Sequence, residues 1–266
     1  FTSVSLLLIL VWSFLRKKLL LTFKAITFFL PVQFIIRKFF IILFIIVLIS
    51  ILNNSNSYAK NIDDYGVISL MYHRFEENKY PSTNIKIKDF KRHLDLIKEN
   101  DFNFISHKEF VDAINSKNLD RKILLTIDDG FKSFYENAWP ILKQRKIPFI
   151  IFINTETIGS NGYMDWSEIK EISSFEFVHI GNHSHTHDYL VDKSDKEIED
   201  DLKTSINIFK EKLNHETKFF AYPFGEYKNS YIEIVKNLGF EYGFGQHSGV
   251  MAVSYTHLTL PTRRGG

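Results

Sequence analysis

The sequence predicts an α/β fold built on a parallel sheet, and two observations carry this prediction. Short apolar runs recur along the chain and alternate with segments whose apolar residues have helical spacing. Three helix starts carry a capping box, in which Ser or Asp is followed three residues later by Glu: Ser106 with Glu109, Asp165 with Glu168, and Ser194 with Glu197. Strands that alternate with helices pair in parallel, so we expect a single sheet that is either open or closed into a barrel.

The elements follow in order along residues 60–252. We expect seven strands, at residues 67–71, 104–105, 123–127, 149–154, 175–180, 219–222 and 242–244. A first helix is expected at residues 89–98, because Phe90, Leu94 and Ile97 fall on one face. Further helices are expected after each capping box and at residues 137–145, 196–213 and 231–238, the last of which is stopped by Gly239.

The strand at residues 123–127 ends in two acids and a glycine, Asp128-Asp129-Gly130. Neighbouring side chains of a strand point to opposite faces, so the two carboxylates can take separate roles around one centre. Gly130 allows the backbone to turn sharply. The alternative is a helix N-cap followed by a turn, because Asp-Asp-Gly is also common in loops.

The second distinctive stretch is Gly181-Asn182-His183-Ser184-His185-Thr186-His187, which follows the strand expected at 175–180. A single buried histidine would be read as a core residue. Histidines that alternate with Ser and Thr do not fit a core, a helix face or a solvated loop, and they favour a metal site. One carboxylate and two imidazoles form a common catalytic ligand set that leaves positions open for water and substrate.

Three motifs together resemble a known family. They are Thr126-Ile127-Asp128-Asp129-Gly130, then His183-Ser184-x-x-His187, then Phe220-Ala221-Tyr222-Pro223-Phe224-Gly225. Their combination resembles the polysaccharide deacetylases, the NodB-homology or carbohydrate esterase family 4 group, over residues 67 to about 249. The Tyr-Pro-Phe-Gly turn, with residues 70–73 and 244–249, looks closest to the poly-N-acetylglucosamine deacetylase branch. The resemblance implies a distorted (β/α)7 barrel in a single domain.

The resemblance also implies a role for each motif residue. Asp129, His183 and His187 would hold one divalent metal ion, with zinc expected first and iron, cobalt or nickel as alternatives. Asp128 would be the general base, and the backbone N–H of Phe224 would stabilise the oxyanion. Ser184 would fix the histidine loop or a ligand by hydrogen bonding. Tyr222, in the third motif, is a further candidate for contact with the substrate.

The chain departs from the family pattern at Ala221, where many members have an Arg that orients the base. Two further candidates for the site carry an open alternative. His73 would line the site or be a packing histidine, and Trp166 would stack on a sugar ring or simply pack. His185 is expected to face away from the metal because it lies two residues from each neighbouring histidine, with a role as a substitute ligand as the alternative. We assign no role to His93, His107, His179 or His215.

The N-terminal residues 1–59 contain no acid. Residues 37–59 have the shape of a signal peptide, with Arg37-Lys38, a 14-residue apolar stretch at 39–52 and small residues before a cleavage point after Ala59. The stretch is shorter than the ~20 residues of a membrane span, so cleavage is preferred over an uncleaved anchor. Residues 1–36 are read as further membrane segments or as untranslated upstream sequence, because the chain begins with Phe1 and not Met. Export to the cell envelope is expected on either reading.

The C-terminal residues 253–266 resemble the translation of a sequencing adapter, so His257 receives no role. We therefore expect the deacetylase domain, residues 60–252, to be incomplete and to lack the C-terminal motif that supplies the family's general acid. Six basic residues precede residue 60 and two follow residue 252, which leaves 25 Lys and Arg against 31 Asp and Glu in the domain. This acidic balance argues against a nucleic-acid partner. The absence of Cys excludes thiolate metal sites and disulfides.

The motifs thus favour a metal-dependent hydrolase that removes N-acetyl groups from an N-acetylglucosamine polysaccharide, with a β-1,6-linked polymer favoured. Peptidoglycan and chitin oligomers are alternative substrates. A non-catalytic glycan-binding protein on the same fold is the alternative of a different class, and Ala221 and the missing acid favour it. A metal phosphoesterase is disfavoured, because neither motif lies near a glycine-rich phosphate loop or a basic cluster.

Overall fold

The computed structural model describes residues 67–116, 121–246, 260–261 and 263–264, together with residues 12, 13, 15, 16 and 41–44 near the N-terminus. The chain divides into two compact units, Phe1–Lys60 and Asn61–Gly266. In the first unit the described residues are helical and exposed. Among the described helices, none combines the length and the hydropathy of a membrane span. Most of the expected signal peptide or anchor at 37–59 lies outside the described residues, as do His247 and His257.

The second unit is built on a parallel sheet with the strand order β10-β9-β8-β7-β6-β5-β1-β11. The short β4 pairs with the start of β5 on the side away from β1, since β1 and β4 both pair with Ile123. The strands are β1 (Ile68–Tyr72), β4 (Asn103–Phe104), β5 (Lys122–Asp128), β6 (Phe149–Ile153), β7 (Val178–Asn182), β8 (Phe219–Ala221), β9 (Tyr242–Gly245), β10 (Leu260–Pro261) and β11 (Arg263–Arg264).

The two ends of this strand order lie next to each other in sequence and in space. β10 pairs with β9 and β11 pairs with β1, and only residue 262 separates β10 from β11. The sheet is therefore curled until its edges meet, as a distorted barrel requires. β10 and β11 therefore occupy the position between β9 and β1. The adapter origin of residues 253–266 stays a prediction.

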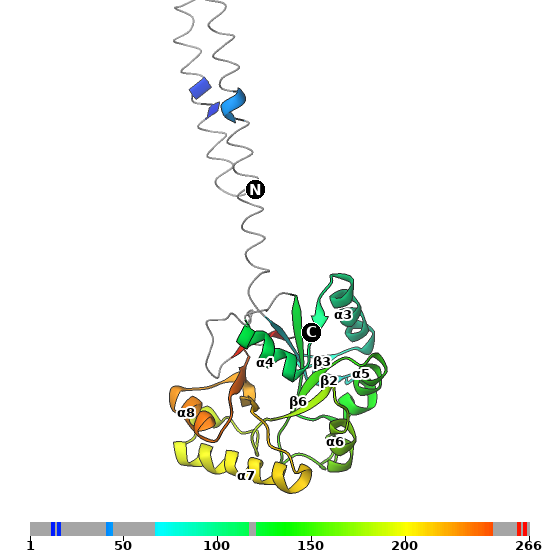
Figure 1. The fold of residues 1–266 in the computed structure, drawn as a ribbon, viewed down its shortest axis with the longest axis vertical. Helices are drawn as coiled ribbons and strands as arrows, with labels where there is room; N and C mark the ends of the chain where they lie inside the picture. The colour runs from blue at the N-terminus through cyan, green and yellow to red at the C-terminus, as the bar shows by residue number, and fades with distance from the viewer. Residues whose placement is uncertain are drawn as a thin grey trace, which may run out of the picture. The chain divides into compact units, whose positions relative to one another are not determined.

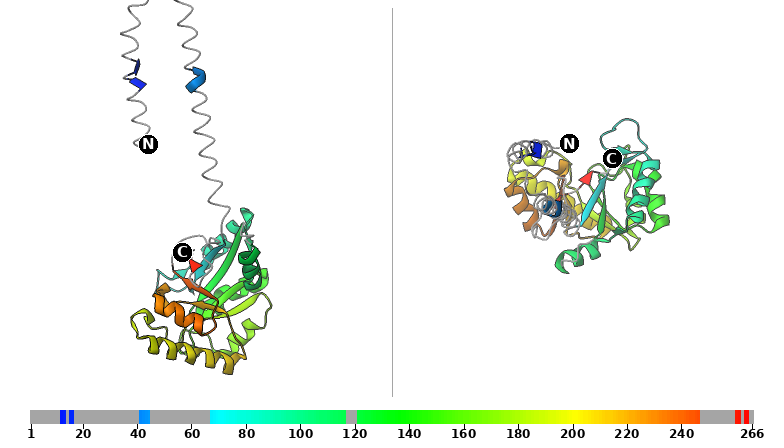
Figure 2. Two further views of the ribbon diagram at one scale, coloured as in Figure 1. Left: turned by 60° about the vertical axis from the view of Figure 1, so that its left-hand side comes forward. Right: turned by 90° about the horizontal axis from the view of Figure 1, so that it is seen from above.

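Helices surround the curled sheet. They are α3 (Ile87–Glu99), α4 (His107–Ser116), α5 (Trp139–Arg145), α6 (Trp166–Ser173), α7 (Asp195–Leu213) and α8 (Asn229–Asn237). Figure 1 shows α3, α5 and α6 along one side of the sheet, with α7 and α8 along the other. The two views of Figure 2 show the same separation between the green helices and the yellow and orange ones.

All three predicted capping boxes form. In α6 and α7 the N-cap side chains of Asp165 and Ser194 accept from the backbone of Glu168 and Glu197, whose carboxylates return the bond to the N-cap N–H. At α4, Ser106 N–H donates to the Glu109 carboxylate at 2.7 Å and Ser106 Oγ accepts from Glu109 N–H at 3.3 Å. Each helix start is thus fixed by local sequence.

The seven predicted strands are present, with shifts at some ends. The strand expected at 175–180 begins at Val178, because Phe175 and Phe177 pack on the Trp139 ring before the strand starts. The helix expected at 137–145 begins at Trp139 and is preceded by a π-helical turn, η1 (Phe134–Ala138). A separate parallel pair, β2 (Arg74–Phe75) with β3 (Asn84–Ile85), was not predicted, because two-residue strands are too short to show alternation.

The buried side chains form clusters on both faces of the barrel wall. The interior contains Leu124, Ile150, Phe152, Phe219 and Phe244 from successive strands, and Phe110 of α4 packs against them. The outward-facing Leu125 and Ile127 pack with residues of α3, α5 and α6, while a third cluster lies beneath α7 and α8. The filled interior leaves the carboxyl ends of the strands as the place for a site.

Candidate metal centre

The alternation of β5 decides where Asp128 lies. Leu124 belongs to the barrel interior, while Leu125 and Ile127 pack with the residues of the helix layer. Thr126 and Asp128 share the face of Leu124, because side chains two apart in a strand point the same way. Asp128 is the last residue of β5 and is 5% exposed, so it lies buried at the top of the barrel interior.

Asp129 leaves the strand in a left-handed turn. Its φ is +76°, and Gly130 has the same value. Glycine tolerates this conformation, whereas for Asp129 it is a local strain of the kind that clusters at functional sites. The turn sends the Asp129 carboxylate to the end of the barrel beside Asp128 and toward the end of β7.

The histidine loop folds back on itself after β7 through side-chain hydrogen bonds. Asn182 Oδ1 accepts from Ser184 N–H at 2.9 Å, and Ser184 Oγ accepts from His187 N–H at 3.0 Å. Ser184 and His187 also have left-handed backbones, with φ of +70° and +57°. This reversal brings His183 and His187 to the same side, with ring centroids 4.8 Å apart.

The Asp129, His183 and His187 side chains meet at one point. Asp129 Oδ1 lies 3.4 Å from His183 Nε2 and 3.2 Å from His187 Nε2, and all three candidate ligand atoms lie within 4.8 Å of one another. Two ligands of a tetrahedral zinc ion, each ~2.0–2.2 Å from the metal, lie about 3.3–3.6 Å apart. The 3.4 Å separation falls in this range, and the 3.2 Å separation lies just below it.

The hydrogen bonding of His183 supports a cation at this point. His183 Nδ1 lies 2.7 Å from the Ala221 carbonyl oxygen, which only accepts, so Nδ1 carries the proton. Burial lowers the pKa of His183, so the ring is neutral and Nε2 presents a lone pair. Among the described residues, Asp129 Oδ1 is buried without a hydrogen-bond partner. Lone pairs that face one another in a buried space repel, and a divalent metal would satisfy all of them.

The two adjacent carboxylates differ in their surroundings. Burial raises the pKa of Asp128 well above its ordinary value, and the charge of Asp129 raises it further. Burial acts to raise the pKa of Asp129, but the hydrogen bonds and positive charge that His183 and His187 supply when protonated hold it well below the usual range. Where the rings are neutral, a bound metal ion would supply that positive charge in their place. Asp129 is thus the ionised ligand, and Asp128 is the carboxyl group with high proton affinity.

A cavity of about 140 Å³ lies over Asp128 and the three candidate ligands. Its lining includes three residues that the sequence singled out, His73, Tyr222 and Phe224, together with Met71 and Gln246. Burial raises the pKa of Tyr222, so its phenol is neutral. The structure therefore places His73 at the site, although its role as a substrate contact stays a prediction.

Phe224 lies at the mouth of this cavity on the Pro223–Gly225 turn. Its φ is +60°, its side chain is 51% exposed, and its ring centroid lies 4.7 Å from that of His187. The next residue must be glycine, because a Cβ on Gly225 would lie 2.1 Å from the Cβ of Gln246. The turn therefore passes close to the histidine loop and covers one side of the metal centre.

Of the two alternatives given for Trp166, the structure supports packing. Trp166 begins α6, is half-buried against the main hydrophobic cluster and lines neither of the cavities at the metal centre. It is a packing residue at the start of the helix, next to the capping residue Asp165. His185 also lies away from the ligands, with Nδ1 2.8 Å from Thr155 Oγ1.

Sequence reasoning missed the residue that holds the histidine loop from outside. The Asp201 carboxylate accepts from His185 N–H at 2.8 Å, Thr186 N–H at 3.0 Å and Thr186 Oγ1 at 2.8 Å. Asp201 lies in α7 among other acids, so no local pattern distinguishes it. Only the packing of α7 beside the loop reveals its role.

The curled parallel sheet and the Asp-His-His set at its carboxyl end define an α/β barrel domain with a candidate metal centre. Comparison with family models indicates the particular family, because residues 115–243 match the polysaccharide deacetylase model. This stretch, slightly less than half of the chain, is similar to the polysaccharide deacetylases. The predicted resemblance and fold are confirmed.

Curated relatives support the same assignment. A poly-beta-1,6-N-acetyl-D-glucosamine N-deacetylase of Staphylococcus epidermidis is 28% identical over 191 residues, which cover 66% of this chain and 65% of the relative. The enzyme of the same name from Staphylococcus aureus strain MSSA476 is 26% identical, with 78% and 85% covered. A putative polysaccharide deacetylase of Bacillus subtilis, YxkH, is 23% identical, with 68% and 64% covered. The chain thus spans slightly less than two thirds of the length of two of these relatives.

Solved structures share the fold. IcaB from Ammonifex degensii superimposes with a TM-score of 0.68 and is 25% identical, covering 76% of this chain and 92% of that one. The Streptococcus pyogenes deacetylase PplD, solved in complex with acetate, gives a TM-score of 0.69 at 24% identity, with 75% and 92% covered. At this identity the second likeness concerns the fold alone.

Proposed function

We propose that this chain is a metal-dependent polysaccharide N-deacetylase that removes acetyl groups from an N-acetylglucosamine polymer, with a β-1,6-linked polymer as the favoured substrate. One observation carries the proposal, namely the meeting of Asp129 Oδ1 with the Nε2 atoms of His183 and His187 beside the buried Asp128. The names of the Staphylococcus relatives support the substrate.

Each residue of the site has a separate role in amide hydrolysis. Asp129, His183 and His187 would hold a divalent ion, which supplies polarisation of the acetyl carbonyl and an attacking water of lowered pKa. Asp128, which lines the same cavity, accepts the proton of that water as it bonds to the carbonyl carbon. The N–H of Phe224 is the candidate donor to the resulting oxyanion. The C–N bond then breaks, acetate leaves, and the sugar amine takes up a proton.

At the position of Ala221, many members of the family have an Arg that orients the general base. Ala221 has no side chain that could orient Asp128, but its carbonyl fixes the tautomer of His183. Asp128 Oδ1 is buried without a hydrogen-bond partner among the described residues. We therefore still propose Asp128 as the general base. Its proton affinity comes from burial and from the charge of Asp129.

Acetate release from defined glycans tests the proposal. The metal-loaded protein is incubated with oligomers of β-1,6-linked N-acetylglucosamine, with chitooligosaccharides and with peptidoglycan fragments, and Asp129→Ala serves as the control. We expect release that is fastest with the β-1,6-linked oligomers and absent in the variant. Binding of these glycans without release by any metal form would replace the enzyme with a glycan-binding protein.

We further propose that the protein acts in the cell envelope. The basic and apolar pattern of residues 37–59 supports export, with cleavage after Ala59 preferred over retention as a membrane anchor. N-terminal sequencing of the protein recovered from expressing cells tests this. A new N-terminus at Lys60 is expected, while an intact segment in the membrane fraction would establish the anchor.

A further inference from the structure

The histidine loop is attached to α7 by a buried side-chain contact that the mechanism above does not use. Asn182 Nδ2 donates to Ser205 Oγ at 2.9 Å. Asn182 is 1% exposed, and Ser205 is fully buried. Asn182 Oδ1 accepts from Ser184 N–H at 2.9 Å, so the orientation of the amide is fixed by a bond on each side. Ser205 therefore holds the side chain that folds the loop back on itself.

Asp201 provides a second point of attachment one helical turn before Ser205. Residues four apart lie on the same face of a helix, so both side chains face the loop. The Asp201 carboxylate accepts from His185 N–H at 2.8 Å, Thr186 N–H at 3.0 Å and Thr186 Oγ1 at 2.8 Å. Thr186 Oγ1 in turn accepts from Asp188 N–H at 3.2 Å. The residues between and beside the two ligand histidines are thus bonded to α7 directly or through one further bond.

The loop after β6 holds the same segment through the main chain. Thr155 N–H donates to the Ser184 carbonyl at 3.3 Å, and Glu156 N–H donates to the His185 carbonyl at 3.0 Å. Two elements outside the histidine loop therefore fix its backbone. None of these bonds uses the Nε2 atom of a ligand histidine.

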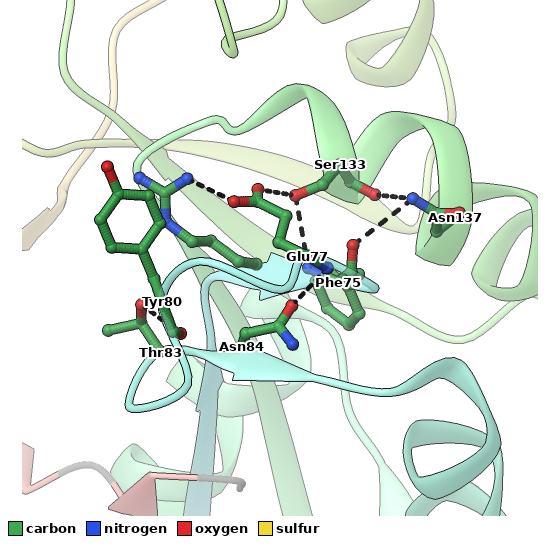
Figure 3. Close-up of polar contacts among 8 residues, drawn as sticks. Phe75, Glu77, Tyr80, Thr83, Asn84, Ser133 and Asn137 are labelled. Atoms are coloured by element: carbon green, nitrogen blue, oxygen red, sulfur yellow. Dashed lines mark hydrogen bonds and ion pairs between the residues drawn. The ribbon is translucent and has the colours of Figure 1, made fainter.

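A separate network holds the turn that carries Asp129. Ser133, four residues further along, accepts from Phe75 N–H at 3.3 Å and donates to Glu77 Oε1 at 2.6 Å. Glu77 N–H donates to Asn84 Oδ1 at 2.8 Å. Figure 3 shows how Glu77 lies between Ser133 on the helix and Asn84 on β3. The network ties the helix that follows the Asp129 turn to the β2–β3 pair.

Main-chain bonds fix the Asp129 turn on its other side. Met164 N–H donates to the Gly130 carbonyl and Lys132 N–H donates to the Gly162 carbonyl, each at 2.9 Å. These bonds hold the residues next to Asp129, whose left-handed φ of +76° needs such support. The bonds around Asp129 share no residue with those that hold the histidine loop.

These bonds act against a repulsion within the ligand set. Asp129 Oδ1 lies 3.4 Å and 3.2 Å from the Nε2 atoms of His183 and His187, so lone pairs face one another. Side chains on a free loop would move apart in the absence of a metal. Every bond described above joins groups other than the ligand atoms, so none of them requires a metal to form. The cost of ordering the ligands is then met during folding and not on metal binding.

We propose that the metal centre is preformed in the metal-free protein, with Ser205 as a positioning residue of the histidine ligands and Ser133 as a positioning residue of Asp129. Ser205 acts through Asn182, and Ser133 acts through the helix start that follows the Asp129 turn. This inference rests on the proposed function, because it concerns the same metal centre. It describes how the ligands are held, so it is tested by metal binding without substrate.

Hydrogen exchange of the full chain tests whether the loop is ordered without metal. Mass spectrometry of peptides covering residues 182–188 compares the chelated and zinc-loaded proteins. The wild-type exchange rates should agree within about threefold in the two forms. In chelated Ser205→Ala they should rise about 10-fold and return on zinc loading, while peptides of β5 exchange as in the wild type. Wild-type loop amides that are protected only after zinc loading would overturn the preformed centre.

Zinc affinity, measured by competition with a chromogenic chelator, tests the two positioning residues. Ser205→Ala and Ser133→Ala should each raise the dissociation constant about 10-fold. The double variant should raise it about 100-fold, because the two networks share no residue.

Each positioning variant has a matched control. Thr204→Ala removes an exposed hydroxyl of α7 that bonds the Asp200 carbonyl at 2.8 Å, and Ser173→Ala removes an exposed hydroxyl at the end of α6. Both controls should bind zinc like the wild type. Equal affinities of Ser205→Ala and Thr204→Ala would refute the role of Ser205. Equal affinities of Ser133→Ala and Ser173→Ala would refute that of Ser133.

Acetate release separates this inference from the proposed function. If hydrogen exchange and zinc affinity follow the expected pattern but the β-1,6-linked oligomers release no acetate, the preformed centre stands and the deacetylase fails. If acetate is released while the loop is protected only in the zinc-loaded protein, the deacetylase stands and the preformed centre fails.

Discussion

At the scale of single residues, the main chain does much of the positioning in the metal centre. The Ala221 carbonyl fixes the proton of His183, and the Ser184 hydroxyl accepts from the N–H of His187. Asp129, Ser184 and His187 all adopt left-handed backbone conformations. Strained conformations persist only where surrounding bonds hold them, so these bonds are part of the site.

Ser184→Ala tests this view. The variant loses the acceptor of the His187 N–H, and the loop at φ +70° becomes easier to relax. We expect the metal dissociation constant to rise about 10-fold, as for other residues that orient metal ligands. Competition with a chromogenic chelator measures it. Ser174→Ala, which removes an exposed hydroxyl from the end of α6, is the matched control, and equal affinities in the two variants would refute the role of Ser184.

At the scale of elements, α7 supports the histidine loop from outside the barrel. Asp201 accepts three hydrogen bonds from the loop, while the neighbouring Asp200 faces solvent and pairs with Lys196. The helix is fixed at its start by the Ser194 capping box. The position of the loop therefore depends on a helix that contributes no ligand.

Asp201→Ala should weaken metal binding by about 10- to 100-fold, because two backbone N–H groups of the loop lose their acceptor. Asp200→Ala removes a carboxylate from the adjacent position of the same helix and should bind metal like the wild type. Chelator competition and circular dichroism of both variants give the comparison. A loss of helix content in Asp201→Ala alone would indicate a general folding defect in place of a local one.

At the scale of the whole molecule, the barrel has a histidine cluster at the end opposite the metal centre. His179, near the start of β7, stacks on His107 with ring centroids 4.1 Å apart. The ring centroid of His215 lies 5.2 Å from that of His179. Burial, together with the neighbouring imidazoles of His107 and His215, lowers the pKa of His179 to about 3. Burial likewise lowers the pKa of His107. The rings of His179 and His107 are therefore neutral in the folded protein at neutral pH.

This cluster predicts acid sensitivity of the fold. The unfolded chain binds protons at these histidines near pH 6.5, while the folded chain does so only at lower pH, so stability falls as the pH drops below about 6.5. His179→Gln removes one such group and keeps a partner for Thr217 Oγ1, which lies 2.9 Å from His179 Nε2. Urea midpoints of the chelated proteins at pH 7.5, 6.5 and 5.5 should fall less steeply in the variant. If the urea midpoints of the wild type and of His179→Gln fell equally with pH, this explanation of the acid sensitivity would be wrong.

The sequence was sufficient for features that are encoded locally. The strand-helix alternation, the capping boxes and the placement of Asp128, Asp129, His183 and His187 after strands all follow from periodicity and short motifs. Asp201 and Glu77 could not be predicted, because their partners lie far away in sequence and their own surroundings are ordinary. The two alternatives for Trp166 could not be separated, because an aromatic residue at a helix start gives the same sequence pattern whether it faces a ligand or the core.

The central claim, that Asp129 with His183 and His187 holds a metal while Asp128 moves a proton, is tested most directly by metal content measured alongside acetate release. Wild type, Asp129→Ala and Asp128→Asn are loaded with zinc, desalted and assayed on the β-1,6-linked oligomer. We expect about one equivalent of zinc in the wild type and in Asp128→Asn, none in Asp129→Ala, and turnover in the wild type alone. Full turnover by Asp128→Asn, or a full equivalent of zinc in Asp129→Ala, would contradict the account.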